Sequence, residues 1–487
     1  MNSKLPSKIR GGVRLSLLAA AVTLAWGAAT PAQAQWGGLF QNLLQKTQEL
    51  KQQADKKQAE EEAKKGPYKK WGSPAAPSQA LAEQARDFAQ GTPVEELRPL
   101  FERLFIEGER NATLNLQRIG LAALALGRLD LAEKALDGAA FRIDLIYADN
   151  PEAQKAKSLW SAEKVKDFKG EPYERTMSYF YRGLAYAARG DFQNARAMFK
   201  QADYQDTVAE AEQFAGDFAL MPYMAGWASY CDGDSNMAKD FLKQAIKGDQ
   251  KYSEVSVEQP VLVLFETGRT PFKYSAGKYD ELLKWQPHPM PEQTVSNACA
   301  GEPNVCFVEK LIVGADIGFQ AMTRGGRPID AIMNGKAAFK EGAETVASVS
   351  GVVGQVGLQA AAMSGNRDMG NLGLVGSLAS LTAMGVSAAT QTQADIREWE
   401  QLPGTVWLGT GAALQPAPTG TVAVSTSGSS DEKMALSRLV NTPKCQLYWG
   451  RSLTPLSLLS YAGPIEPGVH GRDPVFRQAM TDTFAAK

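Results

Sequence analysis

The stretch that most constrains the fold of this chain is residues 170–203, GEPYERTMSYFYRGLAYAARGDFQNARAMFKQAD. Its small and large apolar residues recur at fixed offsets: Gly183, Tyr186, Gly190, Phe192, Ala195, Phe199 and Ala202. Small residues such as Gly183 and Ala195 let two antiparallel helices approach closely, while the larger side chains fill the seam between them. Gly190 and Asp191 suit the turn, because glycine adopts a left-handed conformation and aspartate caps the next helix. The stretch therefore predicts a helical hairpin.

These offsets are those of a tetratricopeptide repeat. A second copy has Gly120, Gly127, Leu129, Ala132, Leu136 and Ala139, and a third has Gly226, Gly233, Ala238, Leu242 and Ala245. The copies are farther apart than the roughly 34 residues of a tandem array, which indicates interrupted repeats. We therefore expect a mainly α protein in which residues 79–250 form an irregular tetratricopeptide-like helical solenoid.

Composition narrows the class of protein. The chain has 487 residues, of which 44% are hydrophobic, enough for two or three domains with cores. Its 52 lysines and arginines balance 53 aspartates and glutamates, so no basic field favours a polyanion. We predict no nucleic-acid partner, and the oligomeric state is left open.

Residues 1–34 have the pattern of a secretory signal peptide. Lys4, Arg10 and Arg14 precede an apolar run at residues 15–26, and Ala32-Gln33-Ala34 follows it. The run is short for a stable transmembrane helix, and a signal anchor is the alternative. No cysteine lies near the cleavage site, so a lipid anchor is not expected. We predict a periplasmic or secreted protein, with association with the outer membrane left open.

Residues 35–78 are expected to form a polar helical leader and a linker. Apolar residues concentrate early in this stretch, and glutamine, lysine and glutamate follow. A solvated helix and a coiled-coil or membrane-surface arm are the two interpretations.

The four cysteines of an exported chain are expected to pair. Cys299 and Cys306 enclose a short loop whose glycine and proline suit a tight closure, so we predict a disulfide between them. Whether Cys231 and Cys445 also pair is not decided by the sequence.

The pattern changes after residue 250. Residues 261–265 form a continuous apolar run that is typical of a buried strand, and residues 405–408 are also strand-like. We expect residues 251–408 to form a small α+β domain. Residues 409–487 are expected to be a low-complexity and C-terminal segment.

Within that domain, residues 345–390 are rich in glycine and other small residues. Charges occur only at Arg367 and Asp368, between two segments of nearly membrane-spanning length. Small residues at three- and four-residue steps allow close helix packing, so we predict a Gly-rich helical pair. It forms either a membrane hairpin or a buried pair that covers the strands.

Motifs for enzyme chemistry are missing from the sequence. It contains no Gly-x-Ser-x-Gly elbow, His-Glu-x-x-His helix or phosphate-binding loop. The two histidines, His288 and His470, lie in loops and are expected at the surface. Glu171 and Glu174 offer a carboxylate pair, but at a helix start they are expected to stabilise the helix dipole. We predict no catalytic residues, no metal site and no cofactor, and hence no enzyme.

The best candidate for a partner-binding groove lies on the third hairpin. Tyr223, Trp227 and Tyr230 share one face of its first helix, and Phe180 and Leu184 occupy equivalent positions in the central hairpin. Such a groove is apolar and aromatic and would receive a peptide or a helix of a protein partner. The alternative is that the following domain packs into it permanently.

Three blocks together resemble a known family: residues 170–174, 262–273 and 394–403, which read GEPYE, LVLFETGRTPFK and ADIREWEQLP. They are similar to uncharacterised bacterial envelope proteins with tetratricopeptide-like repeats. Members are often lipoproteins encoded near an outer-membrane lipoprotein that activates penicillin-binding proteins. The resemblance implies a role in the cell envelope and supplies no catalytic residues.

The functional prediction is a non-enzymatic periplasmic scaffold or adaptor that binds a protein partner in cell-envelope biogenesis. The alternative is a membrane-associated component of an outer-membrane or secretion assembly, which would use the Gly-rich pair at residues 345–390. A third possibility is an enzyme that acts on cell-wall material.

Overall fold

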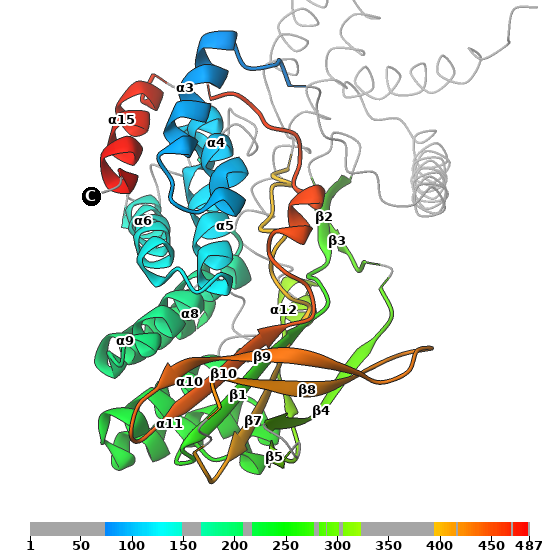
Figure 1. Ribbon diagram of the computed structural model, residues 1–487. Coiled ribbons are helices and arrows are strands. Elements are labelled where there is room, and N and C mark those ends of the chain that lie inside the picture. Colours follow the sequence, from blue (N-terminus) through cyan, green and yellow to red (C-terminus); the bar gives the residue numbers. More distant parts are fainter. Residues whose placement is uncertain are drawn as a thin grey trace, which may run out of the picture. The chain divides into compact units, whose positions relative to one another are not determined.

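The computed structural model describes residues 74–148, 167–207, 217–276, 282–288, 290–300, 305–322, 394–414, 417–468 and 471–485. All of these residues belong to the larger of the two compact units of the chain, and only this unit is described (Figure 1). The expected signal peptide, nearly all of the polar leader, the Gly-rich pair and His470 lie outside the described residues.

The first part of the unit is helical. Its α-helices are α3 (Gln79–Gln90), α4 (Arg98–Glu107), α5 (Ala112–Ala125), α6 (Leu129–Ala148), α8 (Pro172–Ala188), α9 (Phe192–Thr207), α10 (Leu220–Asp232) and α11 (Ser235–Gly248). Short 3-10 turns are η1 (Glu95–Leu97), η2 (Glu109–Asn111) and η5 (Gln250–Glu254). No helix among the described residues combines the length and the hydropathy needed to cross a membrane.

The three hairpins expected from the glycine offsets are present, because α5 packs on α6, α8 on α9 and α10 on α11. An ideal Cβ on Gly183 would lie 2.5 Å from the Phe199 ring, so only glycine allows this approach of the two helices. Gly190 ends the turn after α8 with φ +78°, a left-handed conformation that favours glycine. The sequence therefore specifies these hairpins locally.

The second part is an eight-stranded mixed sheet with the order β5-β4-β8-β9-β10-β1-β7-β6. The strands are β1 (Val261–Thr267), β4 (Gln293–Ala300), β5 (Val305–Val308), β6 (Ile312–Asp316), β7 (Thr405–Gly411), β8 (Thr419–Thr426), β9 (Glu432–Asn441) and β10 (Gln446–Arg451). β1 and β10 are parallel, and the other neighbouring strands are antiparallel. β2 (Phe272–Ala276) and β3 (Leu282–Gln286) form a separate two-stranded ribbon.

The sheet curls into a half-barrel with a core on each face. On β1, the side chains of Val261, Val263 and Phe265 join the core inside the curl, and those of Leu262 and Leu264 join the core shared with the helices. This alternation is the two-residue period of a strand. Every residue of β1 is buried, because both faces of this central strand are covered.

The last part of the chain, after β10, packs against both the sheet and the helices. η6 (Ser457–Tyr461) follows the sheet, and α15 (Asp473–Phe484) returns to the helices, beside α4 and α6 in Figure 1. The rings of Phe101 and Phe484 meet at 5.0 Å. α12 (Ile317–Met322) is a short helix after β6.

The predicted fold class is wrong. The chain does not combine a solenoid with a small α+β domain, since its helical region precedes a large curled sheet. Three of the eight strands, β8, β9 and β10, come from residues 419–451. The threonines and serines of β8 gave this segment the appearance of low complexity, yet its alternating Val422 and Val424 are fully buried. The two-residue period was present but was masked by the polar face.

Candidate functional site

The three sequence blocks meet where an extended segment passes between helices and sheet. We call residues 394–404 the strap. Trp399, Gln401 and Leu402 of the strap are buried. At its end, the strap joins the turn after β1, where Thr270 N–H donates to Leu402 O and Gly404 N–H donates to Thr267 O, at 3.2 and 2.9 Å. The strap is thus an internal part of the fold.

Glu174 is the point at which all three blocks touch. It occupies the third position of α8, and its side chain accepts the N–H of Glu171 in a capping box. Its Oε2 also accepts from Lys273 Nζ of β2 at 2.6 Å, and its Oε1 accepts from Trp399 N–H of the strap at 2.8 Å. Lys273 Nζ further donates to Arg397 O at 3.0 Å. One carboxylate therefore joins a helix, a strand and the strap.

The ion pair of Glu174 and Lys273 is buried, as is typical of a pair with a structural role. The side chains of Glu174 and Lys273 are 0% and 1% exposed. Burial raises the pKa of Glu174, and the Lys273 ammonium opposes that rise. Because both carboxylate oxygens are occupied by donors and the pair is sealed from solvent, it offers no site for proton exchange with a substrate.

Glu266 of β1 forms a second internal centre. Its carboxylate accepts from Tyr181 Oη and Trp449 Nε1, both at 3.0 Å, and pairs with Arg451 Nη1 at 2.7 Å. Arg451 Nη2 also donates to Gln401 O of the strap. Burial raises the pKa of Glu266 and the Arg451 charge opposes it, while burial and the Glu266 charge raise the pKa of Tyr181. This centre connects α8, the sheet and the strap.

The strap is also paired with the first helices. Arg118 of α5 donates hydrogen bonds from Nε and Nη2 to the Glu400 carboxylate, and Nη2 lies 2.7 Å from Glu400 Oε2. Arg397 Nη1 donates to Asn111 Oδ1 at 2.7 Å and its Nη2 pairs with Asp395 at 2.6 Å. Bidentate contacts of this kind fix orientation as well as position. The strap is therefore held along its whole length.

The predicted groove residues do not line an open groove. Phe180, Leu184, Tyr223 and Trp227 are fully buried, and Tyr230 is partly buried. These side chains belong to the core that the helices share with the sheet. The alternative considered from the sequence, in which the following domain covers this face, describes the structure.

The residues that cover this face are specific. The Trp227 ring meets the edge of Phe192 at 5.9 Å. Tyr223 lies 5.2 Å from Tyr252 of η5 and donates its hydroxyl to Ser256 O at 3.1 Å. Burial raises the pKa of Tyr223 far above its usual range. Residues 252–256 therefore cover the Tyr223 side of the surface that the sequence analysis predicted for a partner.

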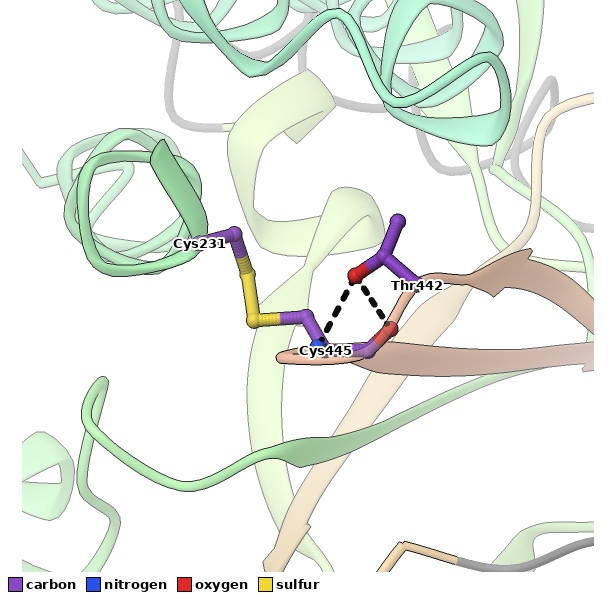
Figure 2. Close-up of a disulfide and its surroundings, with 3 residues drawn as sticks. All are labelled: Cys231, Thr442 and Cys445. Atoms are coloured by element: carbon purple, nitrogen blue, oxygen red, sulfur yellow. Dashed lines mark hydrogen bonds between the residues drawn. A yellow bond between two sulfur atoms is a disulfide. The ribbon is translucent and has the colours of Figure 1, made fainter. Parts of the chain in front are cut away.

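The described part of the chain contains two disulfides. Cys299 and Cys306 are joined across β4 and β5, in the pairing favoured by the sequence. Cys231 of α10 is joined to Cys445, the residue before β10, so this bond ties a helix to the sheet (Figure 2). Thr442 shapes the turn beside it, since its Oγ1 accepts from Cys445 N–H at 3.0 Å (Figure 2). The two disulfides indicate an extracytoplasmic protein.

A cluster of one arginine and three rings lies beside the strap, and the sequence analysis did not predict it. We call Arg269, Phe272, His288 and Tyr461 the Arg269 cluster. The Arg269 guanidinium stacks on the Tyr461 ring at 3.5 Å, and its Nη1 lies 3.4 Å from His288 Nδ1. The His288 ring lies 5.1 Å from Phe272 and 5.9 Å from Tyr461. These residues come from three distant segments, so no local motif marks them.

Exposure differs across this cluster. Arg269 is only 9% exposed, whereas Tyr461 is 52% exposed and Met290, two residues beyond His288, is 38% exposed. The expectation of a surface histidine at His288 is thus refined, because its ring is part of a half-buried cluster. The cluster combines a buried cation with an exposed aromatic ring.

Comparisons with known proteins add no assignment. No protein-family model, no curated protein and no solved structure matches this chain. Among the described residues, no group of three or more histidines, cysteines or carboxylates is arranged to hold a metal ion. The geometry of the chain itself is therefore the basis for a functional proposal.

Proposed function

We propose that this chain is a non-enzymatic scaffold or adaptor of the cell envelope that binds a protein partner. The disulfides support an extracytoplasmic location, and the signal-peptide pattern narrows it to the periplasm or the exterior. The use of Glu174, Glu266 and Glu400 as internal ties supports a rigid scaffold, because each carboxylate is occupied by buried donors.

The observation that carries the proposal is the Arg269 cluster. Arginine and tyrosine are among the residues enriched at energetically important positions of protein interfaces. Tyr461 presents half of its surface to solvent above a guanidinium that is already held in place. Aromatic side chains fixed in this way bind a partner without a large loss of conformational entropy. We therefore propose a binding surface at this cluster rather than on the third hairpin.

Site-specific crosslinking in the intact cell envelope tests this proposal. A photo-crosslinking amino acid replaces Tyr461 in the full exported chain, and the same amino acid replaces Tyr204 of α9 as the matched control. Tyr204 is equally suited, since it is a tyrosine with 55% exposure outside the cluster. We expect position 461 to capture one discrete protein and position 204 to capture none or only background.

The captured protein is then identified by mass spectrometry, purified and titrated against the wild-type chain. Direct binding that Tyr461→Leu weakens supports the scaffold. Identical adducts at positions 461 and 204, or no binding of the purified protein, refute it. Peptidoglycan turnover by the purified chain would refute the non-enzymatic part.

A further inference from the structure

The Arg269 guanidinium differs from the other deeply buried cations of this fold. Arg118, Arg182, Lys273 and Arg397 each have a carboxylate within ion-pair distance. Arg175 donates its Nε to Gln205 Oε1 at 2.9 Å and its Nη1 to Gly170 O at 2.7 Å. For Arg269, no carboxylate among the described residues lies within that distance, and its buried Nε finds no hydrogen-bond acceptor there. A cation that is nine-tenths buried without an anion is costly, which points to an acceptor supplied from outside.

The backbone holds Arg269 in a fixed place. A Cβ on Gly404 of the strap would lie 2.9 Å from Arg269 O, so the two chains are in direct contact. Gly268, the preceding residue, turns the chain with φ +64°, and the next residue, Thr270, is hydrogen-bonded to Leu402 O. Such a preorganised guanidinium loses little freedom when it binds a ligand.

The surroundings select the class of anion. Burial lowers the pKa of Arg269, whereas Tyr461 and the more distant Glu398 and Glu400 favour its charged form. Glu400 is already paired with Arg118, and Glu398 accepts the Lys273 N–H at 2.7 Å. These two carboxylates repel a second negative charge, so a monoanion fits better than a phosphate dianion. Arginine also matches a planar carboxylate with its fork of N–H donors.

The difference in exposure between Arg269 and Tyr461 favours one source of the carboxylate. Arg269 is 9% exposed, whereas the Tyr461 ring on which it stacks is 52% exposed. The end of a chain reaches a recessed group more easily than a side chain in the middle of a peptide. Phe272, His288 and Tyr461 offer ring surfaces to an apolar residue at that end.

We propose that Arg269, His288 and Tyr461 bind the C-terminal carboxylate of a peptide segment of the partner, an inference that rests on the proposed function. Arg269 donates N–H groups to the carboxylate, and Tyr461 and Phe272 contact the last apolar side chain. His288 Nδ1, which accepts from Arg269 Nη1, keeps the guanidinium oriented.

The test uses the full chain with both disulfides intact and peptides labelled with fluorescein at the N-terminus. The probes are Gly-Ser-Gly-Ala-Phe as the free acid, the same peptide as the C-terminal amide, and an amide with aspartate in place of alanine. Fluorescence anisotropy gives Kd for each. We expect the free acid to bind about ten- to one-hundred-fold more tightly than either amide, the range set by charge-assisted hydrogen bonds.

Variants assign the effect to the cluster. Arg269→Gln should abolish the preference for the free acid. It should change the melting temperature little, because the lost contacts with Tyr461 and His288 are offset by the removal of a buried cation that has no anionic partner. Tyr461→Leu should weaken all peptides that bind. Arg189→Gln, which removes an exposed arginine paired with Glu133, is the matched control and should leave Kd unchanged.

Several results would overturn the inference. They are equal affinities for acid and amide, equal affinities for the free acid and the aspartate peptide, stronger competition by inorganic phosphate than by acetate, or no binding of the free acid. The acid-to-amide ratio of the wild type decides the matter even if Arg269→Gln fails to fold. If crosslinking at position 461 still captures a partner, the scaffold stands and only the carboxylate site is rejected.

Discussion

The buried pair of Lys273 and Glu174 gives the sharpest prediction. Lys273→Met removes the ammonium and keeps much of its volume, so Glu174 is left charged in a site sealed from solvent. Breaking a buried pair by removing one partner costs about 3–5 kcal/mol. We expect the free energy of unfolding at pH 7.5 to fall by that amount. Urea unfolding followed by circular dichroism measures it, with the disulfides intact.

The pH dependence of the loss follows from the direction of the pKa shift. Burial already raises the pKa of Glu174 above its usual 4.5 despite Lys273, and removing the cation raises it further. A folded-state carboxyl with a raised pKa binds its proton before the unfolded state does, so stability is greater at low pH and falls as pH rises through the folded pKa. The Lys273→Met loss should therefore shrink as pH is lowered from 7.5 toward 5.

Two variants control this experiment. Lys273→Met combined with Glu174→Gln removes both charges and should recover most of the loss, since no buried charge remains. Lys310→Met removes the ammonium of an exposed pair with Glu254 and should cost about 0–1 kcal/mol. A loss that is equal at pH 5.5 and 7.5, or a double variant as unstable as the single one, would refute the reasoning.

Three further predictions concern stability. Gly183→Ala places a methyl group 2.5 Å from the Phe199 ring and should cost about 1–3 kcal/mol by overpacking in a urea titration. Selective loss of the disulfide between Cys231 and Cys445, which spans 214 residues, should cost about 5 kcal/mol by loop entropy, about twice the cost of losing the bond that spans 7. Calorimetry on the two pairs of Cys→Ala variants checks this ratio, and equal losses would contradict it. Glu400→Gln leaves Arg118 with a neutral partner and should lower the melting temperature, whereas no change would show that the strap is not held by this pair.

Local features of the fold could be predicted from the sequence. The offsets around Gly120, Gly183 and Gly226 predicted three hairpins because the residues that pack in a hairpin lie close in the chain. The loop between Cys299 and Cys306 predicted its disulfide for the same reason.

The strand order of the sheet could not be predicted, because strands that pair are distant from one another in the sequence. β1 was expected as a strand, but its neighbours β10 and β7 lie more than a hundred residues further on, and no local pattern names a partner strand. The strap shows the same limit. Glu400 and Arg397 carry charge, which argues for the surface, and only their pairing with Arg118 and Asn111 makes their burial favourable.

The candidate site was missed for a related reason. Tyr223 and Trp227 share one helix face, and this pattern suits a groove and a core equally well. Arg269, His288 and Tyr461 have no shared spacing, since a turn, a loop and a 3-10 helix bring them together. Sites assembled from separate loops leave no period in the sequence.

The position of β1 in the sheet has a consequence for how the protein is made. A chain that is synthesised from its N-terminus presents β1 long before β7 and β10, the two strands that flank it. During that interval Arg118 and Glu266 are without Glu400 and Arg451, and the apolar face of the helices is uncovered. β10 is the last strand of the sheet to arrive, and α15 then adds Phe476, Met480 and Phe484 to the core shared with the helices, so neither the sheet nor this core is complete before residue 451 has emerged. A chain stalled before that point is a substrate for chaperones and proteases rather than a smaller version of the protein.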